Sequence, residues 1–153
     1  MATEDEARAG ELMALVEAEA VPPNRPMRQA MAAAVAACVA QGLVRATGAG
    51  RIELLYLAFQ LAGGAARHPG AGIVRREVGN CLPMVAEIAE SGSHPERMQC
   101  IDFLSMFGRL DGYCYGRAAY LLTMIGKTGR DEAVAVAIEL EDLSRSVDFP
   151  IDR

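Results

Sequence analysis

Residues 30–44 read AMAAAVAACVAQGLV, and this alanine-rich stretch decides the fold class. Alanine is the best helix former, and the stretch contains no proline that would break a helix. It is shorter than the roughly 20 apolar residues that a membrane-spanning helix needs. About 26 residues with an acidic balance precede Met27, whereas an export signal begins with a short basic region. We therefore expect a buried, alanine-rich helix, and neither an export signal nor a membrane span.

Helical spacing continues on both sides of this stretch. Thr3 and Glu6 form a capping box that begins a first helix, and Asn24 with Pro26 begins the helix that contains residues 30–44. We expect that second helix to end near residues 47–50. Its buried face is predicted to consist of Met27, Met31, Ala34, Val35, Cys38, Val39, Gly42 and Leu43.

The middle of the chain predicts two or three further helices. A third helix covers residues 52–62 and is closed by Gly63 and Gly64, after which a loop leads to Gly72. The helical period then continues from Val74 to Ala89 through Pro83. Because proline interrupts a helix, we expect either one kinked helix or two helices that meet near residues 79–80.

The last third of the chain carries three more helix starts. Ser93 and Glu96 form a second capping box, Asp111 is a cap for the following helix, and Asp131 opens a final helix that runs to about Ser146. The buried face of the final helix is predicted from Val134, Ile138 and Leu143. No segment predicts a strand. We expect an all-α single domain over residues 1–153, a helical bundle or stacked α-hairpins with six to eight helices.

Charge is distributed unevenly along the chain. The formal net charge is -5, an acidic total that argues against electrostatic binding of nucleic acid by the whole surface. Residues 21–76 nevertheless hold seven arginines against one acid, Glu53, and lie between acidic ends. Either the acidic terminal helices pack beside this segment, or its arginines are exposed. Fourteen arginines against the single Lys127 indicate GC-rich coding, which is typical of a bacterium or its phage.

One part of the basic segment suggests DNA binding. Residues 39–54, VAQGLVRATGAGRIEL, resemble the end of a recognition helix followed by the glycine-bearing wing of winged-helix regulators. The resemblance implies phosphate contacts by Arg28, Arg45 and Arg51 within the basic segment 25–76. The sequence departs from that family where the helix should read bases, because alanines stand there. A DNA-binding transcriptional regulator is therefore the alternative interpretation.

The cysteines and histidines do not form a recognisable cofactor or metal site. Cys38, Cys81, Cys100 and Cys114 show no Cys-x-x-Cys spacing, which excludes the usual zinc-finger and thioredoxin motifs. Scattered cysteines on apolar faces are typical of small buried side chains in a reducing cytoplasm, so we expect a cytoplasmic protein. The two histidines, His68 and His94, are too few for two Glu-x-x-His helices. We expect no metal and no cofactor.

The stretch FGRLDGYCYGR, residues 107–117, is the best candidate for a functional site. Tyrosine and arginine are the residue types that supply binding hot spots when they are exposed. The candidate contact patch consists of Arg109, Asp111, Tyr113, Tyr115 and Arg117. We therefore interpret the chain as a non-enzymatic interaction protein, of the adaptor, chaperone, immunity-factor or inhibitor type. Its partner is another protein or a second copy in a homodimer, and not a membrane.

Cys114 supports a second alternative, an enzyme of unrecognised type. If Asp111 caps, Cys114 is the third residue of a helix, where backbone N–H groups and Arg117 can lower a thiol pKa. The same cysteine also lies on an apolar face, where burial would keep it neutral. If Cys114 faces the core, Tyr113 and Arg117 can face a partner. Gly112 and Gly116 lie one turn apart on that helix and are expected to admit a neighbouring helix closely.

Overall fold

The computed structural model describes residues 10, 11, 14–16, 18, 20, 28–68 and 71–148, and this part of the chain is helical without any strand. The named helices are α2 (Gln29–Arg45), α3 (Gly48–Arg67), α4 (Gly72–Gly79), α5 (Leu82–Ser91), α6 (His94–Phe107), α7 (Gly112–Ile125) and α8 (Arg130–Ser146). The all-α prediction is confirmed. The predicted Thr3–Glu6 capping box and the helix start at Asn24 and Pro26 lie outside the described residues.

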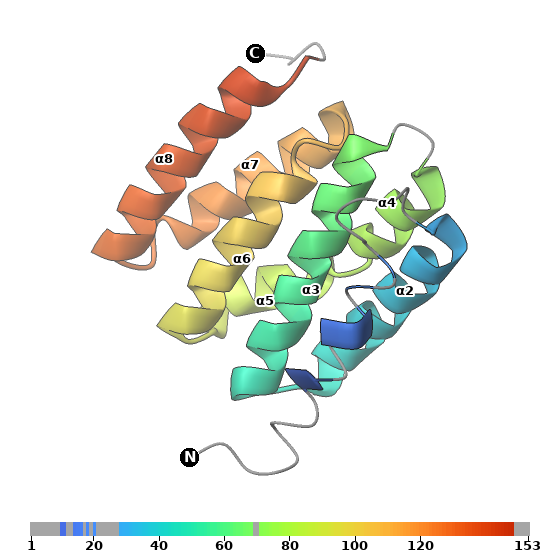
Figure 1. The fold of residues 1–153 in the computed structure, drawn as a ribbon. Coiled ribbons are helices and arrows are strands. Elements are labelled where there is room, and N and C mark those ends of the chain that lie inside the picture. The colour runs from blue at the N-terminus through green and yellow to red at the C-terminus, as the bar shows by residue number, and fades with distance from the viewer. Residues whose placement is uncertain are drawn as a thin grey trace.

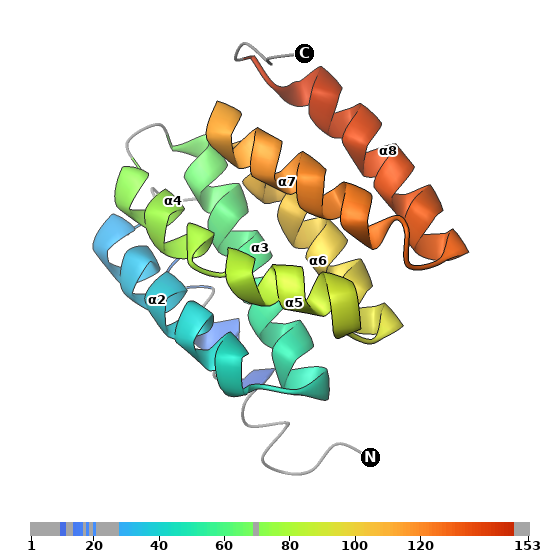
Figure 2. The same cartoon turned by 180° about the vertical axis from the view of Figure 1, so that it is seen from behind.

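The helices form two layers with one helix at each edge. α3 and α6 lie side by side in the front layer of Figure 1, and α3 makes its most extensive helix contact with α6. α4, α5 and α7 form the layer behind them, which Figure 2 shows from its own side. α2 packs on α3 and α4 at one edge, and α8 packs on α6 and α7 at the other. None of the described helices is long and apolar enough to cross a membrane.

Small and branched aliphatic side chains fill the core. Alanines such as Ala32, Ala58 and Ala62 are fully buried, which lets the helices approach closely. The aromatic part of the core is the pair Phe103 and Phe107 on α6, whose ring centroids lie 5.6 Å apart. A core of this kind suits closely packed helices, as the composition predicts.

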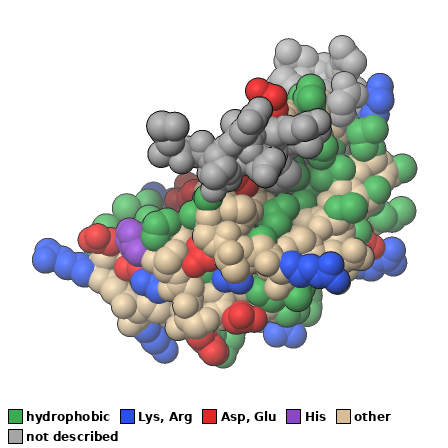
Figure 3. All heavy atoms as spheres, turned by 90° about the horizontal axis from the view of Figure 1, so that it is seen from below, with side chains coloured by type: hydrophobic (Ala, Val, Ile, Leu, Met, Phe, Trp, Pro, Cys, Tyr) green, Lys and Arg blue, Asp and Glu red, His purple; other side chains and the backbone are tan. Residues whose placement is uncertain are grey.

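The predicted buried face of α2 is confirmed at Val39 and Leu43 and wrong at Met31, Ala34 and Cys38, and Met27 lies outside the described residues. Ala32, Ala33, Ala36, Val39 and Leu43 are buried, whereas Met31, Ala34 and Cys38 are exposed. Alanine occupies both faces, so the sequence offers little contrast between the side that packs on α3 and α4 and the side that faces solvent. Figure 3 shows hydrophobic side chains gathered at the surface on the side of the molecule where α2 lies.

α3 is longer at both ends than the sequence predicts. Gly48 to Gly50 form its first turn rather than a break, and Gly48 adopts a φ of +53°, a conformation that favours glycine. Gly63 and Gly64 do not close the helix but lie buried within it. Gly63 faces Met106 of α6, and a Cβ there would lie 3.4 Å from Cγ of Met106, an ordinary contact.

The second of the two predictions for residues 74–89 is confirmed. α4 ends at Gly79, α5 begins at Leu82, and Asn80 with Cys81 forms the turn between them. Pro83 stands in the first turn of α5, where its missing N–H costs nothing. The junction therefore lies at the predicted position, and the two short helices together line one side of the molecule.

The capping predictions at α6 and α7 are confirmed. Ser93 and Glu96 form a reciprocal capping box: the N–H of Glu96 donates to the Ser93 hydroxyl, and the N–H of Ser93 donates to the Glu96 carboxylate. Asp111 caps α7. The turn that follows α7 spans residues 126–129 and exposes Lys127, the single lysine of the chain.

The predicted faces of α7 and α8 differ from the structure at four positions. Val134 and Ile138 of α8 are more than half exposed, whereas Glu132 and Val136 are buried with Leu143. Gly116 admits no helix, since a Cβ there would meet nothing within 4 Å, and Gly112 is exposed. The close approach occurs at Gly108 instead, where a Cβ would lie 2.7 Å from Cδ2 of Leu143.

Candidate functional site

The first turn of α7 orients the candidate residues. The carboxylate of Asp111 accepts a hydrogen bond of 2.8 Å from the N–H of Cys114, which fixes the start of the helix. Cys114 then points into the core and is 5% exposed, while the preceding Tyr113 is 68% exposed. Because residues one apart on a helix point in different directions, the buried cysteine places the tyrosine outside.

One exposed face of α7 carries two tyrosines with an arginine between them. Tyr113, Arg117 and Tyr120 are spaced four and three residues apart, so they follow one another along the helix surface. The guanidinium carbon of Arg117 lies 5.4 Å from the ring centroid of Tyr113, and Nε of Arg117 donates to the Tyr113 hydroxyl over 3.3 Å. Tyr120 is 63% exposed. The patch predicted from the sequence omitted Tyr120. Its spacing of seven residues from Tyr113 indicates that the two tyrosines share one face of the helix.

Two cavities open beside this face. The first, of 490 Å³, is lined by Gly72, Arg75, Arg76, Gly79, Asn80, Leu82, Phe107, Asp111, Tyr113 and Cys114. The second, of 370 Å³, is lined by Gly79, Leu82, Pro83, Ala86, Tyr113, Arg117, Tyr120 and Leu121. The two share Gly79, Leu82 and Tyr113, so they lie next to each other. We call them together the α7 groove: α4 and α5 form one wall and α7 forms the other.

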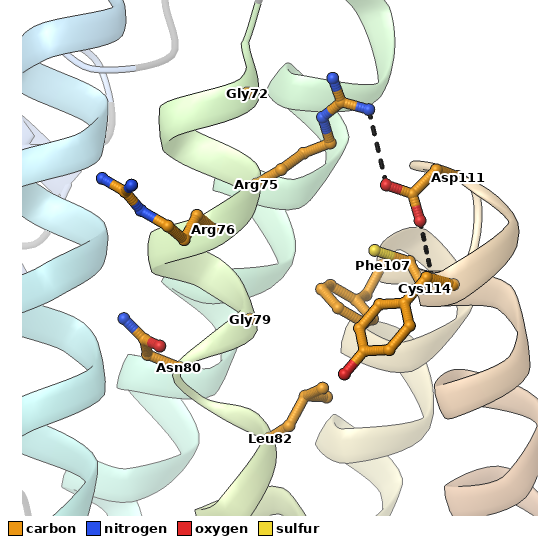
Figure 4. A pocket seen from close by; sticks show the side chains of 10 residues that line it. Gly72, Arg75, Arg76, Gly79, Asn80, Leu82, Phe107, Asp111 and Cys114 are labelled. Atoms are coloured by element: carbon orange, nitrogen blue, oxygen red, sulfur yellow. Dashed lines mark hydrogen bonds and ion pairs between the residues drawn. The ribbon is translucent and has the colours of Figure 1, made fainter.

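An ion pair crosses the α4 end of the α7 groove. Nη1 of Arg75 lies 3.6 Å from a carboxylate oxygen of Asp111, while the other oxygen caps α7. Figure 4 shows Arg75 reaching from α4 toward Asp111, and Arg76 and Asn80 projecting from another side of α4. The Asp111 carboxylate is therefore engaged twice, which holds the end of α7 against α4.

The environment of Cys114 keeps its thiol protonated. Burial, the hydrogen bond to the Asp111 side chain and the Asp111 charge raise its pKa to about 12, against the opposing effects of Arg75 and the backbone hydrogen bond. A thiolate is the reactive form of cysteine, and at neutral pH this group is almost entirely thiol. The start of a helix can lower a thiol pKa, but here burial and the Asp111 carboxylate raise the pKa of Cys114 by more.

Two residues of the predicted patch lie away from the α7 groove. Arg109 forms an ion pair of 2.5 Å with Asp142 of α8, and its Nε is buried without a hydrogen-bond partner in the described part of the chain. Tyr115 is half-buried and packs against the core. The structure therefore brings Asp111, Tyr113 and Arg117 together at the α7 groove and separates Arg109 and Tyr115 from them.

The winged-helix resemblance does not extend to the structure. The residues that correspond to the wing form the first turn of α3, and Arg51 is paired with Glu96 at 3.2 Å while its Nε donates to the carbonyl of Ala46. Arg28 and Arg45 flank the two ends of α2, about 25 Å apart for a helix of 17 residues. Of the three arginines proposed to contact phosphates, Arg51 is thus already paired, and Arg28 and Arg45 lie a helix length apart.

Two of the described acids of the C-terminal helix pair with arginines of α6 and of the turn after it rather than with the basic segment. Asp142 pairs with Arg109, and Glu132 pairs with Arg97 at 2.8 Å. Two arginines of the basic segment pair with acids outside α8: Arg51 pairs with Glu96, and Arg75 pairs with Asp111. Burial opposes ionisation of Glu96, but the Ser93 hydrogen bonds and Arg51 outweigh it and lower its pKa.

A cluster at the start of α8 was not foreseen from the sequence. Oε1 of Glu132 accepts hydrogen bonds from Nε and Nη2 of Arg97 at 3.0 and 2.8 Å and lies 2.9 Å from Nδ1 of His94. The hydrogen bonds from His94 and Arg97 lower the pKa of Glu132 to about 2. The glutamate is 3% exposed, and its buried carboxylate connects the first turn of α8 to the first turn of α6. Among the described residues, no group of three or more His, Cys, Asp or Glu is placed to hold a metal ion.

No protein-family model matches the sequence, and neither the curated proteins nor the solved structures give a match. The candidate function therefore depends on the chemistry of the α7 groove and of the surface around it.

Proposed function

We propose that the protein acts by protein–protein contact and that it binds its partner through the α7 groove. The observation that carries this proposal is the row of Tyr113, Arg117 and Tyr120 beside two adjoining cavities. Both tyrosines are about two-thirds exposed, although they are the kind of side chain that folding usually covers at least in part.

The residue types along the α7 groove suit a protein partner. Tyrosine and arginine are enriched among interface hot spots because they combine a large apolar surface with polar groups. The contact between Arg117 and Tyr113 holds both side chains in place before binding, so less conformational entropy is lost when a partner arrives. The wall opposite offers Leu82, Pro83 and Ala86, which are apolar.

The proposal concerns binding and not catalysis. A partner would dock as a peptide segment or helix lying between α5 and α7, in the manner of an adaptor, chaperone, immunity factor or inhibitor. The cytoplasm is the proposed location, and a homodimer is the form in which a second copy would use the same surface.

Gly79 offers a direct test, because it lines both cavities. Its Cβ would lie 3.9 Å from the Phe107 ring, an ordinary contact, so Gly79→Leu should fold and place a side chain in the middle of the α7 groove. The matched control is Gly116→Leu, the same change on α7 in open space and outside both cavities.

The measurement is selection of a phage-displayed library of random 12-residue peptides on the full chain. We expect enriched peptides that bind the unchanged protein and Gly116→Leu equally, and Gly79→Leu at least tenfold more weakly. Circular dichroism of both variants confirms that they are folded. The proposal fails if no peptide is enriched, or if every enriched peptide binds Gly79→Leu as well as it binds the unchanged protein.

A further inference from the structure

The walls of the α7 groove differ in chemistry. The cavity beside α5 is lined by the apolar Leu82, Pro83 and Ala86, with Arg117 and Tyr120 on its α7 side. The cavity beside α4 includes Arg75 and Arg76, which project from different sides of α4. A ligand that fills both cavities therefore meets an apolar wall on α5 and guanidinium groups on α4 and α7.

The charges of the α7 groove oppose those of the whole chain. Its charged lining residues are Arg75, Arg76, Arg117 and the single acid Asp111, in a protein whose net charge is -5. Asp111 is occupied, since its carboxylate accepts the N–H of Cys114 and faces Arg75 at 3.6 Å. Asp111 and Arg75 thus neutralise each other, and Arg76 and Arg117 remain as the cationic groups for a ligand.

Two of the arginines keep donors that a carboxylate could use. Arg117 is exposed and donates through Nε to the Tyr113 hydroxyl, so the terminal nitrogens of its guanidinium can still donate to a ligand. The side chain of Arg76 is 74% exposed and meets only the adjacent Glu77 at 3.6 Å, an exposed pair that contributes little. Arginine binds carboxylates with two parallel hydrogen bonds, so it is well suited to acidic ligands.

We propose that the partner presents an acidic peptide segment with an apolar or aromatic anchor, and that the segment lies along the α7 groove. The anchor packs on the apolar wall that α5 provides, and the carboxylates face Arg117 on α7 and Arg76 on α4. This inference rests on the proposed function, which requires only that the groove bind a protein.

The length of the α7 groove sets the size of the segment. From Asp111 to Leu121 α7 rises by about 15 Å, which corresponds to roughly five residues of an extended chain or about three turns of a helix. A peptide of 12 residues therefore covers the groove in either conformation, and free 12-residue peptides from the selection are suitable probes.

The test reverses the charge of the groove without filling it. Arg76→Glu with Arg117→Glu changes two exposed side chains of the lining, and neither makes a buried contact. The matched control is Arg45→Glu with Arg130→Glu, which changes the net charge equally at two exposed positions outside both cavities. Arg75 is left unchanged because it holds Asp111.

We consider the peptides that are selected on the unchanged protein and bind Gly79→Leu more weakly. We expect these peptides to be rich in Asp and Glu beside a Leu, Phe, Tyr or Trp. Their affinity should fall at least tenfold on the groove double variant and less than twofold on the control, at an ionic strength of about 0.15 M where exposed charges beyond about 8 Å are screened. Selection on the groove double variant should enrich Lys and Arg instead.

The outcomes separate the two proposals. Peptides that lose binding on Gly79→Leu but show no acidic excess overturn this inference and leave the proposed function standing. Peptides that bind Gly79→Leu as well as the unchanged protein overturn both the proposed function and this inference. If sedimentation shows that the unchanged protein self-associates at the concentrations used and Gly79→Leu does not, the occupant is a second copy, and the acidic-peptide inference is wrong.

Discussion

Gly108 and Gly116 stand eight residues apart, and only one of them needs to be glycine. A Cβ at Gly116 would enter open space, so Gly116→Ala should stabilise the protein by about 1 kcal/mol, the difference in helix propensity. A Cβ at Gly108 would lie 2.7 Å from Leu143 and 3.0 Å from Cβ of Ala118. Because neither neighbour can move aside cheaply, Gly108→Ala should destabilise by roughly 1–3 kcal/mol.

Urea denaturation of the two alanine variants measures both effects. The unchanged protein is the reference, and the slope of the free energy against urea should be the same for all three. A Gly108→Ala variant as stable as the reference would contradict the close packing of α8 on the end of α6.

Glu132 makes stability depend on pH. Its pKa is about 2 in the folded chain and 4.5 as the ordinary value, so the unfolded chain binds the proton more readily. The stabilisation from the ionised group is therefore fully present above pH 4.5 and is lost as pH falls toward 2. Glu132→Gln, which cannot ionise, should be less stable than the unchanged protein near neutral pH, and the difference should shrink below pH 4.5.

Thermal unfolding at several pH values between 3 and 7 measures this difference. His94 and Arg97 are the partners of the carboxylate, and Asp131→Asn, a change at the exposed neighbouring acid, is the control. A gap between Glu132→Gln and the unchanged protein that stayed constant down to pH 3 would show that the charge of Glu132 is not the cause.

The four cysteines should differ in reactivity. Burial raises the pKa of Cys81, Cys100 and Cys114 to about 12 in each case, while Cys38 is exposed on α2. Iodoacetamide at neutral pH should therefore modify Cys38 and leave the other three intact until the protein is unfolded. Mass spectrometry of the digested protein identifies the modified residues. Modification of Cys114 as fast as a free thiol would restore the enzyme interpretation.

At the scale of a helix, the cap of α7 is the feature to test. Asp111→Ala removes both the hydrogen bond to the N–H of Cys114 and the ion pair with Arg75, and should cost about 1 kcal/mol. Asp111→Asn keeps a capping oxygen and loses only the charge, so it should cost less. Equal losses in urea denaturation of the two variants would show that the ion pair matters more than the cap.

The caps are also what the sequence could predict of these helices. A capping box is local: Ser93 and Glu96 contact each other across three residues, and Asp111 caps the residue three positions ahead. The junction between α4 and α5 was predictable for the same reason, because glycine, asparagine and proline act on their own backbone. Helix periodicity showed that Cys114 and Tyr113 point in different directions, but the sequence left open which of them faces the core, and the structure places Cys114 there.

Contacts between distant helices could not be predicted in this way. Glu132 is buried because Arg97 and His94 supply its partners from 35 and 38 residues away, and Val134 and Ile138 are then turned outward. Gly63 lies inside α3 and faces Met106 of α6, whereas glycine alone predicts the end of a helix. The α7 groove was missed for this reason: its second wall, α4 and α5, is remote from α7 in sequence.

At the scale of the whole molecule, we expect one cooperative unfolding transition. The layer of α4, α5 and α7 shares its core with α3 and α6, so neither layer can bury its apolar side chains alone. Far-ultraviolet circular dichroism follows all helices. Tyrosine fluorescence follows α7 most closely, since three of the four tyrosines lie there and tryptophan is absent.

The two signals should give the same midpoint in urea, as a two-state transition requires. Gly108→Ala should shift both signals together. Separate midpoints would mean that α7 unfolds as an independent unit, and the single-domain prediction for residues 1–153 would then be wrong.

The exposed Lys127 in the turn after α7 has a consequence for surface chemistry. A reagent that acylates primary amines can react with one side chain of this protein, Lys127, because the other basic side chains are arginines and histidines. That amine lies outside both cavities of the α7 groove. A biotin or sensor surface coupled through Lys127 would therefore hold the molecule in one orientation with the groove open to solvent, and only the α-amino group would compete for the reagent.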